Sequence, residues 1–179
     1  MSRILLAAGA SAALHKACDL ASKLAQEGHA VRALLTPRAA ALVSPQLFEA
    51  LTGEPAFVSE FGEARRAGMD HIELARWAEV YLAAPATAAM IGRLALGLAD
   101  DLACTVALAL PPGVKRFVCP AMNPHMLAAA PVARNLAQLA RDGWQVIEPD
   151  AGRLACGDEG LGRLAEPGEI LAVLRDRMG

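Results

Sequence analysis

Three side chains of the 179-residue sequence could transfer a proton or hold a carboxylate. His71 begins the stretch HIELARWAEV (71–80), and an imidazole suits proton transfer near neutral pH. Asn123 lies in PAMNPHM (120–126), and its amide can donate hydrogen bonds to a carboxylate without adding a fixed charge. Cys156 lies in ACGDEGLGR (155–163), and a free thiol that is protonated at neutral pH can donate a proton. Together they could supply a base, a carboxylate holder and an acid.

Each of these residues also has a simpler structural interpretation. His71 could be a surface histidine at the start of a helix, Asn123 a turn residue, and Cys156 an inert loop cysteine. Arg76, five residues after His71, could contact a substrate carboxylate or phosphate, or could be solvated at the end of a helix. His15 is expected to face solvent.

Short apolar runs alternate with segments of helical spacing along the chain. The runs end at glycine or proline and predict buried strands. Strands that alternate with helices are typical of a parallel sheet covered on both faces. The expected fold is therefore α/β, with a single doubly wound parallel sheet of the Rossmann-like or flavodoxin-like kind, in one domain that spans 1–179. The expected strands are 3–8, 31–35, 79–84, 116–119 and 144–147, and the expected helices are 12–27, 38–43, 45–52, 87–96, 99–109, 131–142 and 168–177.

The carboxyl ends of the expected strands are the places where such sheets bind ligands. These ends carry small or hydroxylated residues, which let a phosphate or a flat ring approach the backbone. The last of them opens a stretch without clear periodicity at 148–166, which contains four glycines. Loops of this length in a compact domain usually cover or bind a ligand, so we expect an active-site flap there. The other ends lie at 9–11, 36–37, 85–87 and 120–123.

The composition argues against several classes of protein. The 17 basic and 19 acidic residues are interspersed, without a basic stripe, so nucleic acid is not an expected partner. No apolar run approaches the roughly 20 residues of a membrane span. The four cysteines include no CxxC pair, so we expect no metal site. We therefore expect a cytoplasmic protein.

Several stretches resemble, in the same order, the signatures of the homo-oligomeric flavin-containing cysteine decarboxylases. PAMNPHM resembles that family's Pro-x-Met-Asn-x-x-Met motif, and HIELARWAEV resembles the segment with its essential histidine. APAT (84–87) with IGRLALGLADDLACT (91–105) is similar to its second signature, and SAALHK (11–16) and SPQLFEALTGEP (44–55) match its early portion. LACGDEGLGRLAEPGEI (154–170) resembles the flap that marks the phosphopantothenoylcysteine decarboxylase branch.

The resemblance implies a cofactor, a reaction and residue roles. It implies FMN bound between the subunits of a homotrimer or a trimer-based dodecamer. It also implies that 4'-phospho-N-pantothenoylcysteine is oxidised to a thioaldehyde, loses CO2, and is reduced again from the ene-thiol to 4'-phosphopantetheine, in coenzyme A biosynthesis. By their motif positions, His71 is the base, Asn123 binds and orients the substrate, and Cys156 protonates the ene-thiol. Met126 packs near the substrate, and Arg76 stays a candidate contact to the substrate carboxylate or phosphate.

The same resemblance assigns cofactor contacts to the strand ends. The backbone at 10–12 meets the FMN phosphate at a helix N-terminus, and Ser11 adds a hydroxyl group. Ala10 stands where the family commonly has glycine, which adds a methyl group where the phosphate approaches. Ala89-Met90 stands where the family commonly has Asn-Thr, which removes polar contacts to the flavin or substrate. The expected cofactor-binding residues are Ala10, Ser11, Ala12, Thr36, Ala86, Thr87, Ala88, Ala89 and Ala121.

Three alternative functions stay open at this point. A peptidyl-cysteine decarboxylase would release the ene-thiol, and the flap residue Cys156 argues against it. A flavin prenyltransferase of similar fold does not need the PAMN and ACG motifs together. A flavin-binding regulatory subunit is less expected because His71, Asn123 and Cys156 are all present. The ligase domain that is often fused in bacteria is absent, so we expect a stand-alone decarboxylase.

Overall fold

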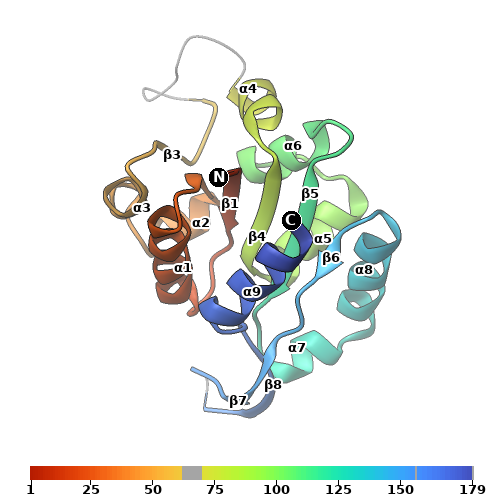
Figure 1. Cartoon of the computed structure of the whole chain (residues 1–179). Helices are drawn as coiled ribbons and strands as arrows, with labels where there is room; N and C mark the ends of the chain where they lie inside the picture. The colour runs from red at the N-terminus through yellow and green to blue at the C-terminus, as the bar shows by residue number, and fades with distance from the viewer. Residues whose placement is uncertain (62–69, 156, 179) are drawn as a thin grey trace.

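The computed structural model describes residues 1–61, 70–155 and 157–178. Its main element is a six-stranded parallel sheet with the strand order β3-β2-β1-β4-β5-β6 (Figure 1). The chain winds outward from the centre in both directions, which defines a doubly wound sheet and confirms the predicted fold class. The strands are β1 (Arg3–Ala8), β2 (Ala30–Leu35), β3 (Ala56–Phe57), β4 (Val80–Ala86), β5 (Lys115–Pro120) and β6 (Gln145–Val146).

The central strands β1 and β4 are covered on both faces. No side chain from Ile4 to Ala8 is exposed to solvent. Burial on both faces explains why these strands are continuous apolar runs and lack the alternation of a half-exposed strand. Ile4 lies opposite Val31 of β2 and Val80 of β4, with all three strands parallel. Their carboxyl ends therefore meet at one edge of the sheet.

Helices cover both faces of the sheet (Figure 1). They are α1 (Leu14–Gln26), α2 (Pro37–Ala40), α3 (Pro45–Thr52), α4 (Asp70–Trp77), α5 (Ala88–Leu96), α6 (Leu102–Ala109), α7 (Pro124–Ala128), α8 (Ala130–Arg141) and α9 (Pro167–Met178). Leu20 of α1 and Leu171 of α9 belong to the core on one face, and Ile91 of α5 and Leu139 of α8 to the core on the other. None of the described helices is long and apolar enough to cross a membrane.

The predicted flap at 148–166 contains an antiparallel hairpin that the hydrophobic pattern did not reveal. The hairpin is formed by β7 (Asp150–Arg153) and β8 (Glu159–Arg163), which lie at the bottom of Figure 1. Gly152, Gly160 and Gly162 have positive φ angles and no side chains, so they interrupt the alternation from which a strand is inferred. The N–H of Met122 donates to the carbonyl of Gly162 (3.0 Å), which attaches the hairpin to the end of β5.

Other element limits also differ from the expectation. β4 runs through Pro85 to Ala86, although proline was expected to end it; its pairing with β5 is irregular there, so the missing N–H falls outside the regular ladder. α6 begins later than expected because the Asp101 carboxylate caps it, accepting from the N–H of Cys104 (2.8 Å). A helix at α4 was anticipated only through the positions of His71 and Arg76, and α7 was not expected, since a helix of five residues shows little periodicity.

Replacing Gly162 by alanine is expected to detach the hairpin. A Cβ atom there would lie 2.2 Å from the carbonyl oxygen of Met122, and the Gly162 φ of +146° is rarely adopted by other residues. We expect the hairpin to lose about 1–3 kcal/mol of local stability, measured by amide hydrogen exchange over β7 and β8. Gly168→Ala is the control, because a Cβ there meets nothing within 4 Å. Equal protection in the two variants would contradict the docking role.

Candidate functional site

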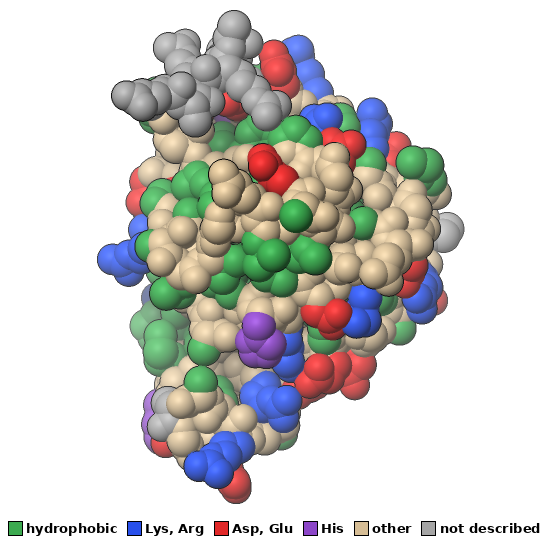
Figure 2. Space-filling model, turned by 90° about the vertical axis from the view of Figure 1, so that its left-hand side faces the viewer, with side chains coloured by type: hydrophobic (Ala, Val, Ile, Leu, Met, Phe, Trp, Pro, Cys, Tyr) green, Lys and Arg blue, Asp and Glu red, His purple; other side chains and the backbone are tan. Residues whose placement is uncertain are grey.

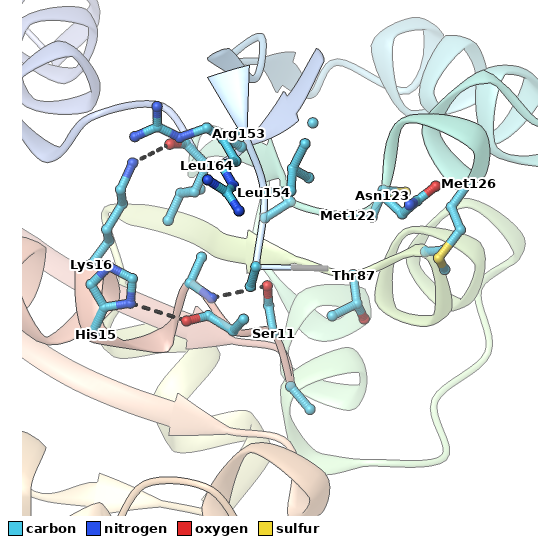
Figure 3. Close-up of a pocket in the computed structure, with 18 residues that line it drawn as sticks. Ser11, His15, Lys16, Thr87, Met122, Asn123, Met126, Arg153, Leu154 and Leu164 are labelled. Carbon is cyan, nitrogen blue, oxygen red and sulfur yellow. Dashed lines mark hydrogen bonds between the residues drawn. The ribbon is translucent and has the colours of Figure 1, made fainter. Parts of the chain in front are cut away.

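A cavity of about 620 Å³ opens at the carboxyl ends of β1, β4 and β5, next to the hairpin (Figure 3). Small-molecule sites usually have volumes of about 300–1,000 Å³. The cavity lies at the switch point of the doubly wound sheet, where the topology predicted a ligand. The structure brings together here eight of the predicted site residues. They are Ala10, Ser11, Ala12, Thr87, Ala88, Ala121, Asn123 and Met126.

The turn between β1 and α1 has the features of an anion site. The N–H groups of Ala10, Ser11 and Ala12 have no acceptor among the described residues. The Ser11 hydroxyl accepts from the N–H of Ala13 (3.2 Å), and its carbonyl accepts from the N–H of Leu14 (3.1 Å), where α1 begins. Unpaired N–H groups at the N-terminus of a helix attract negative charge. This turn can therefore hold a phosphate group.

The ends of β1 and β4 touch, and this contact places the start of α5 beside the turn. The N–H of Gly9 donates to the carbonyl of Pro85 (2.9 Å). A Cβ on Gly9 would lie 2.9 Å from the same oxygen, so a side chain would push the strand ends apart. Thr87 caps α5, since its hydroxyl accepts from the N–H of Met90 (3.3 Å). The turn and the cap form adjoining walls of the cavity.

Asn123 joins the loop after β5 to the hairpin. Its side-chain oxygen accepts from the N–H of His125 (2.8 Å), which caps α7, and its Nδ2 donates to the carboxylate of Asp158. The amide is thus oriented by its own helix and is already bound to a carboxylate. Met126 lies nearby at the edge of the cavity (Figure 3). Asn123 is therefore placed to hold a carboxylate in this cavity.

Basic side chains that the sequence analysis did not assign to the site also line the cavity. They are Lys16, Arg153 and Arg163, together with His15, which reaches the rim although it is exposed (Figure 3). No aspartate or glutamate lines the described part of the cavity. The cavity therefore attracts anions. The sequence could have indicated two of these residues, because His15 and Lys16 lie in the first turn of α1, directly after the predicted phosphate turn.

Lys16 links α1 to the chain after the hairpin. Its ammonium group donates to the carbonyl of Leu164 (2.7 Å) and to Oε1 of Glu166 (2.8 Å). Nη2 of Arg163 also lies 3.2 Å from Oε1 of Glu166. The hydrogen bond from Lys16, more than the charges of Lys16 and Arg163, lowers the pKa of Glu166 below its ordinary value. Glu166 thus holds two of the cavity's cations in place.

His71 and Arg76 lie apart from the cavity. His71 is the second residue of α4, which lies at the top of Figure 1, whereas the hairpin lies at the bottom. Its Nδ1 is 2.6 Å from Oε2 of Glu60, and Arg76 is exposed on the same helix. Neither residue lines the cavity. One chain therefore does not bring His71 and Asn123 together, and Cys156 lies outside the described residues.

Three predicted cofactor contacts lie near the cavity but not in its lining. Thr36 caps α2, with its hydroxyl accepting from the N–H of Ala39 (3.2 Å). Ala86 is buried at the end of β4, and Ala89 is exposed in the first turn of α5. Their contacts to a cofactor stay predictions.

The described thiols and acids form no second reactive centre. Cys104 and Cys119 are buried, and burial raises the pKa of both thiols, so they stay protonated. Cys18 is half-buried in α1. In the described part of the chain, no group of three or more His, Cys, Asp or Glu could hold a metal ion.

The fold and cavity define a doubly wound α/β protein with an anion site at its switch point. The family model "Flavoprotein" matches residues 1–179, and the chain belongs to this family. It is 43% identical over 170 residues to the coenzyme A biosynthesis bifunctional protein CoaBC of Bacillus subtilis, covering 95% of this chain and 41% of that protein. The chain thus spans about two fifths of the length of the curated relatives it matches.

Two solved structures are similar over almost their whole length. One is a PPC decarboxylase mutant complexed with pantothenoylaminoethenethiol, with a TM-score of 0.87, 32% identity, and coverage of 99% of this chain and 98% of that one. The other is the FMN-dependent cysteine decarboxylase SpaF, with a TM-score of 0.81, 27% identity, and coverage of 100% and 98%.

Glu166→Gln is expected to lower stability at neutral pH but not in acid. Because the folded pKa of Glu166 is depressed, its stabilising effect is complete above the ordinary glutamate pKa of about 4.3 and is lost as the pH falls through the lower folded value. The effect is at most about 1 kcal/mol because the Glu166 side chain is exposed to solvent, which screens the interaction. Thermal unfolding at pH 7 and pH 3 measures it, with Glu159→Gln in β8 as the control. A difference from wild type that persists at pH 3 would contradict this origin.

Proposed function

We propose that the chain catalyses the FMN-dependent decarboxylation of 4'-phospho-N-pantothenoylcysteine to 4'-phosphopantetheine and CO2, in coenzyme A biosynthesis. The observation that carries this proposal is one cavity that combines the anion turn at 10–12 with the carboxylate-binding amide of Asn123. The similar structures support the reaction, since one is a PPC decarboxylase with a bound ene-thiol and the other is FMN-dependent. The similarity to CoaBC supports the role in coenzyme A biosynthesis.

The residues of the β1–α1 turn fit FMN. The N–H groups of Ala10, Ser11 and Ala12, which have no acceptor in the described part of the chain, would hold its phosphate. The small side chains of Ala88 and Ala121 would let the ring approach the strand ends. FMN bound here would supply hydride transfer in both directions, and thus the electron sink that a cysteine carboxylate lacks.

Asn123 would hold the substrate carboxylate. The substrate would replace the Asp158 carboxylate at Nδ2, where the geometry for a carboxylate already exists. A neutral amide suits this step, because a cation would stabilise the ground-state carboxylate and oppose loss of CO2. Lys16, Arg153 and Arg163 would attract the phosphorylated substrate to the cavity. Cys156 would protonate the ene-thiol from the flap.

We also propose that the protein is a homotrimer or a trimer-based dodecamer in the cytoplasm. Support comes from the distance between α4 and the cavity, because a second subunit could bring its His71 to the site. Figure 2 shows hydrophobic side chains gathered on the side of the molecule that carries α3. Leu42 and Leu47, which are 64% and 45% exposed, lie before and within α3. Exposed apolar patches of this kind often mark subunit interfaces.

Purified protein with FMN and phosphopantothenoylcysteine should release CO2 and form 4'-phosphopantetheine, as measured by mass spectrometry. Cys156→Ser should still release CO2 but should accumulate the ene-thiol, because the proton donor for the return step is missing. Cys18→Ser, a half-buried thiol outside the cavity lining, is the control and should form the normal product.

Absence of CO2 from FMN-loaded wild-type protein would contradict the proposed function. Normal product from Cys156→Ser would contradict only the role of that cysteine. The sequence left one competing substrate open, a peptide with a C-terminal cysteine. If that peptide loses CO2 and phosphopantothenoylcysteine does not, the peptide is the substrate class.

Mixed oligomers of two inactive variants should recover activity. His71→Asn and Asn123→Asp each remove one part of the site, and we expect each to lose at least about 100-fold in kcat. If every site takes His71 from one subunit and Asn123 from the next, random 1:1 mixing restores about a quarter of the sites. Co-expression with two tags and decarboxylation assays measure this recovery. Activity no higher than the sum of the two variants would contradict a shared site.

A further inference from the structure

Glu60 and His71 form a carboxylate–imidazole pair outside the cavity. Oε2 of Glu60 lies 2.6 Å from Nδ1 of His71. Both side chains are partly buried, with 21% and 25% exposed. Because both side chains are partly buried, solvent and salt screen this pair less than the exposed ion pairs of the surface.

The two partners are fixed by different elements. Glu60 follows β3, which pairs in parallel with β2 through Ala56 and Phe57. His71 is held by α4, whose residues Leu74 and Ala75 are buried in the core. The pair therefore joins the edge of the sheet to the helix, and the imidazole ring has a defined orientation.

The chemistry of the pair determines which ring nitrogen can exchange a proton. An ionised carboxylate only accepts hydrogen bonds, so Nδ1 of His71 must carry the hydrogen. In the neutral ring the lone pair is then on Nε2, the nitrogen that Glu60 does not contact. Without the carboxylate, the proton would distribute between the two nitrogens.

We propose that Glu60 is a positioning residue for the decarboxylation, holding His71 in the tautomer whose Nε2 accepts the proton. This inference rests on the proposed function, in which His71 is the base. It adds a residue that no motif contains, and it assigns the proton transfer to one atom. A carboxylate that orients a histidine base in this way is known to matter strongly for proton transfer in other enzymes.

The ¹⁵N chemical shifts of the imidazole in the FMN-loaded protein test the tautomer directly. We expect wild-type His71 to show a protonated Nδ1 and an unprotonated Nε2 when neutral. Glu60→Gln should mix the tautomers, because a glutamine side chain can either donate to or accept from Nδ1. Glu60→Asp keeps the carboxylate and should restore the wild-type pattern at least in part. Glu54→Gln is the matched control, since Glu54 is 31% exposed and pairs with Arg32.

Kinetics supply the second readout. Glu60→Gln should lower kcat by at least about tenfold with little change in KM, whereas Glu54→Gln should leave both unchanged. Glu60→Asp should recover much of the lost kcat. An unchanged tautomer in Glu60→Gln, or equal losses in Glu60→Gln and Glu54→Gln, would overturn the inference. Failure of the proposed function is distinguishable, because it would appear as no CO2 from the wild-type protein.

Discussion

The N–H of Gly9 donates to the carbonyl of Pro85 across 2.9 Å, and the cavity depends on this contact between the ends of β1 and β4. No side chain fits at Gly9, because its Cβ would meet the same oxygen. The strand ends can therefore approach closely at the switch point of the sheet. That approach sets the unpaired N–H groups of the β1–α1 turn beside Thr87, the cap of α5. The backbone of this turn can therefore receive an anion, and the basic side chains that line the cavity add to this attraction.

The charged side chains around the β1–α1 turn belong to α1, to the hairpin and to the residues that follow the hairpin. Glu166 holds Lys16 and Arg163, so two cations face the cavity with their positions restrained. Asp158 binds Asn123, so the hairpin carries a carboxylate at the place assigned to that of the substrate. In the proposed reaction, the substrate carboxylate replaces the Asp158 carboxylate as the partner of the Asn123 amide.

The hydrophobic pattern was enough to predict five of the six strands of the sheet, because strands buried on both faces are continuous apolar runs. It did not predict β3, which has only two residues, both of them half-buried. The place of Asn123 followed from its motif at a strand end. Contacts across the fold could not be predicted in this way: Lys16 meets Leu164, which is 148 residues away, and the glycines of the hairpin hide its strands. Glu60 lies 11 residues before His71 in a stretch without periodicity, so no local signal links the two.

A crystal structure of the FMN complex tests the central claim most directly, since the claim is that the β1–α1 turn holds the cofactor of a shared site. We predict that the phosphate oxygens accept hydrogen bonds from the N–H groups of Ala10, Ser11 and Ala12. We also predict that the flavin ring lies between this turn and His71 of a neighbouring subunit. FMN bound with its phosphate elsewhere, or with no His71 of any subunit near the ring, would contradict the account.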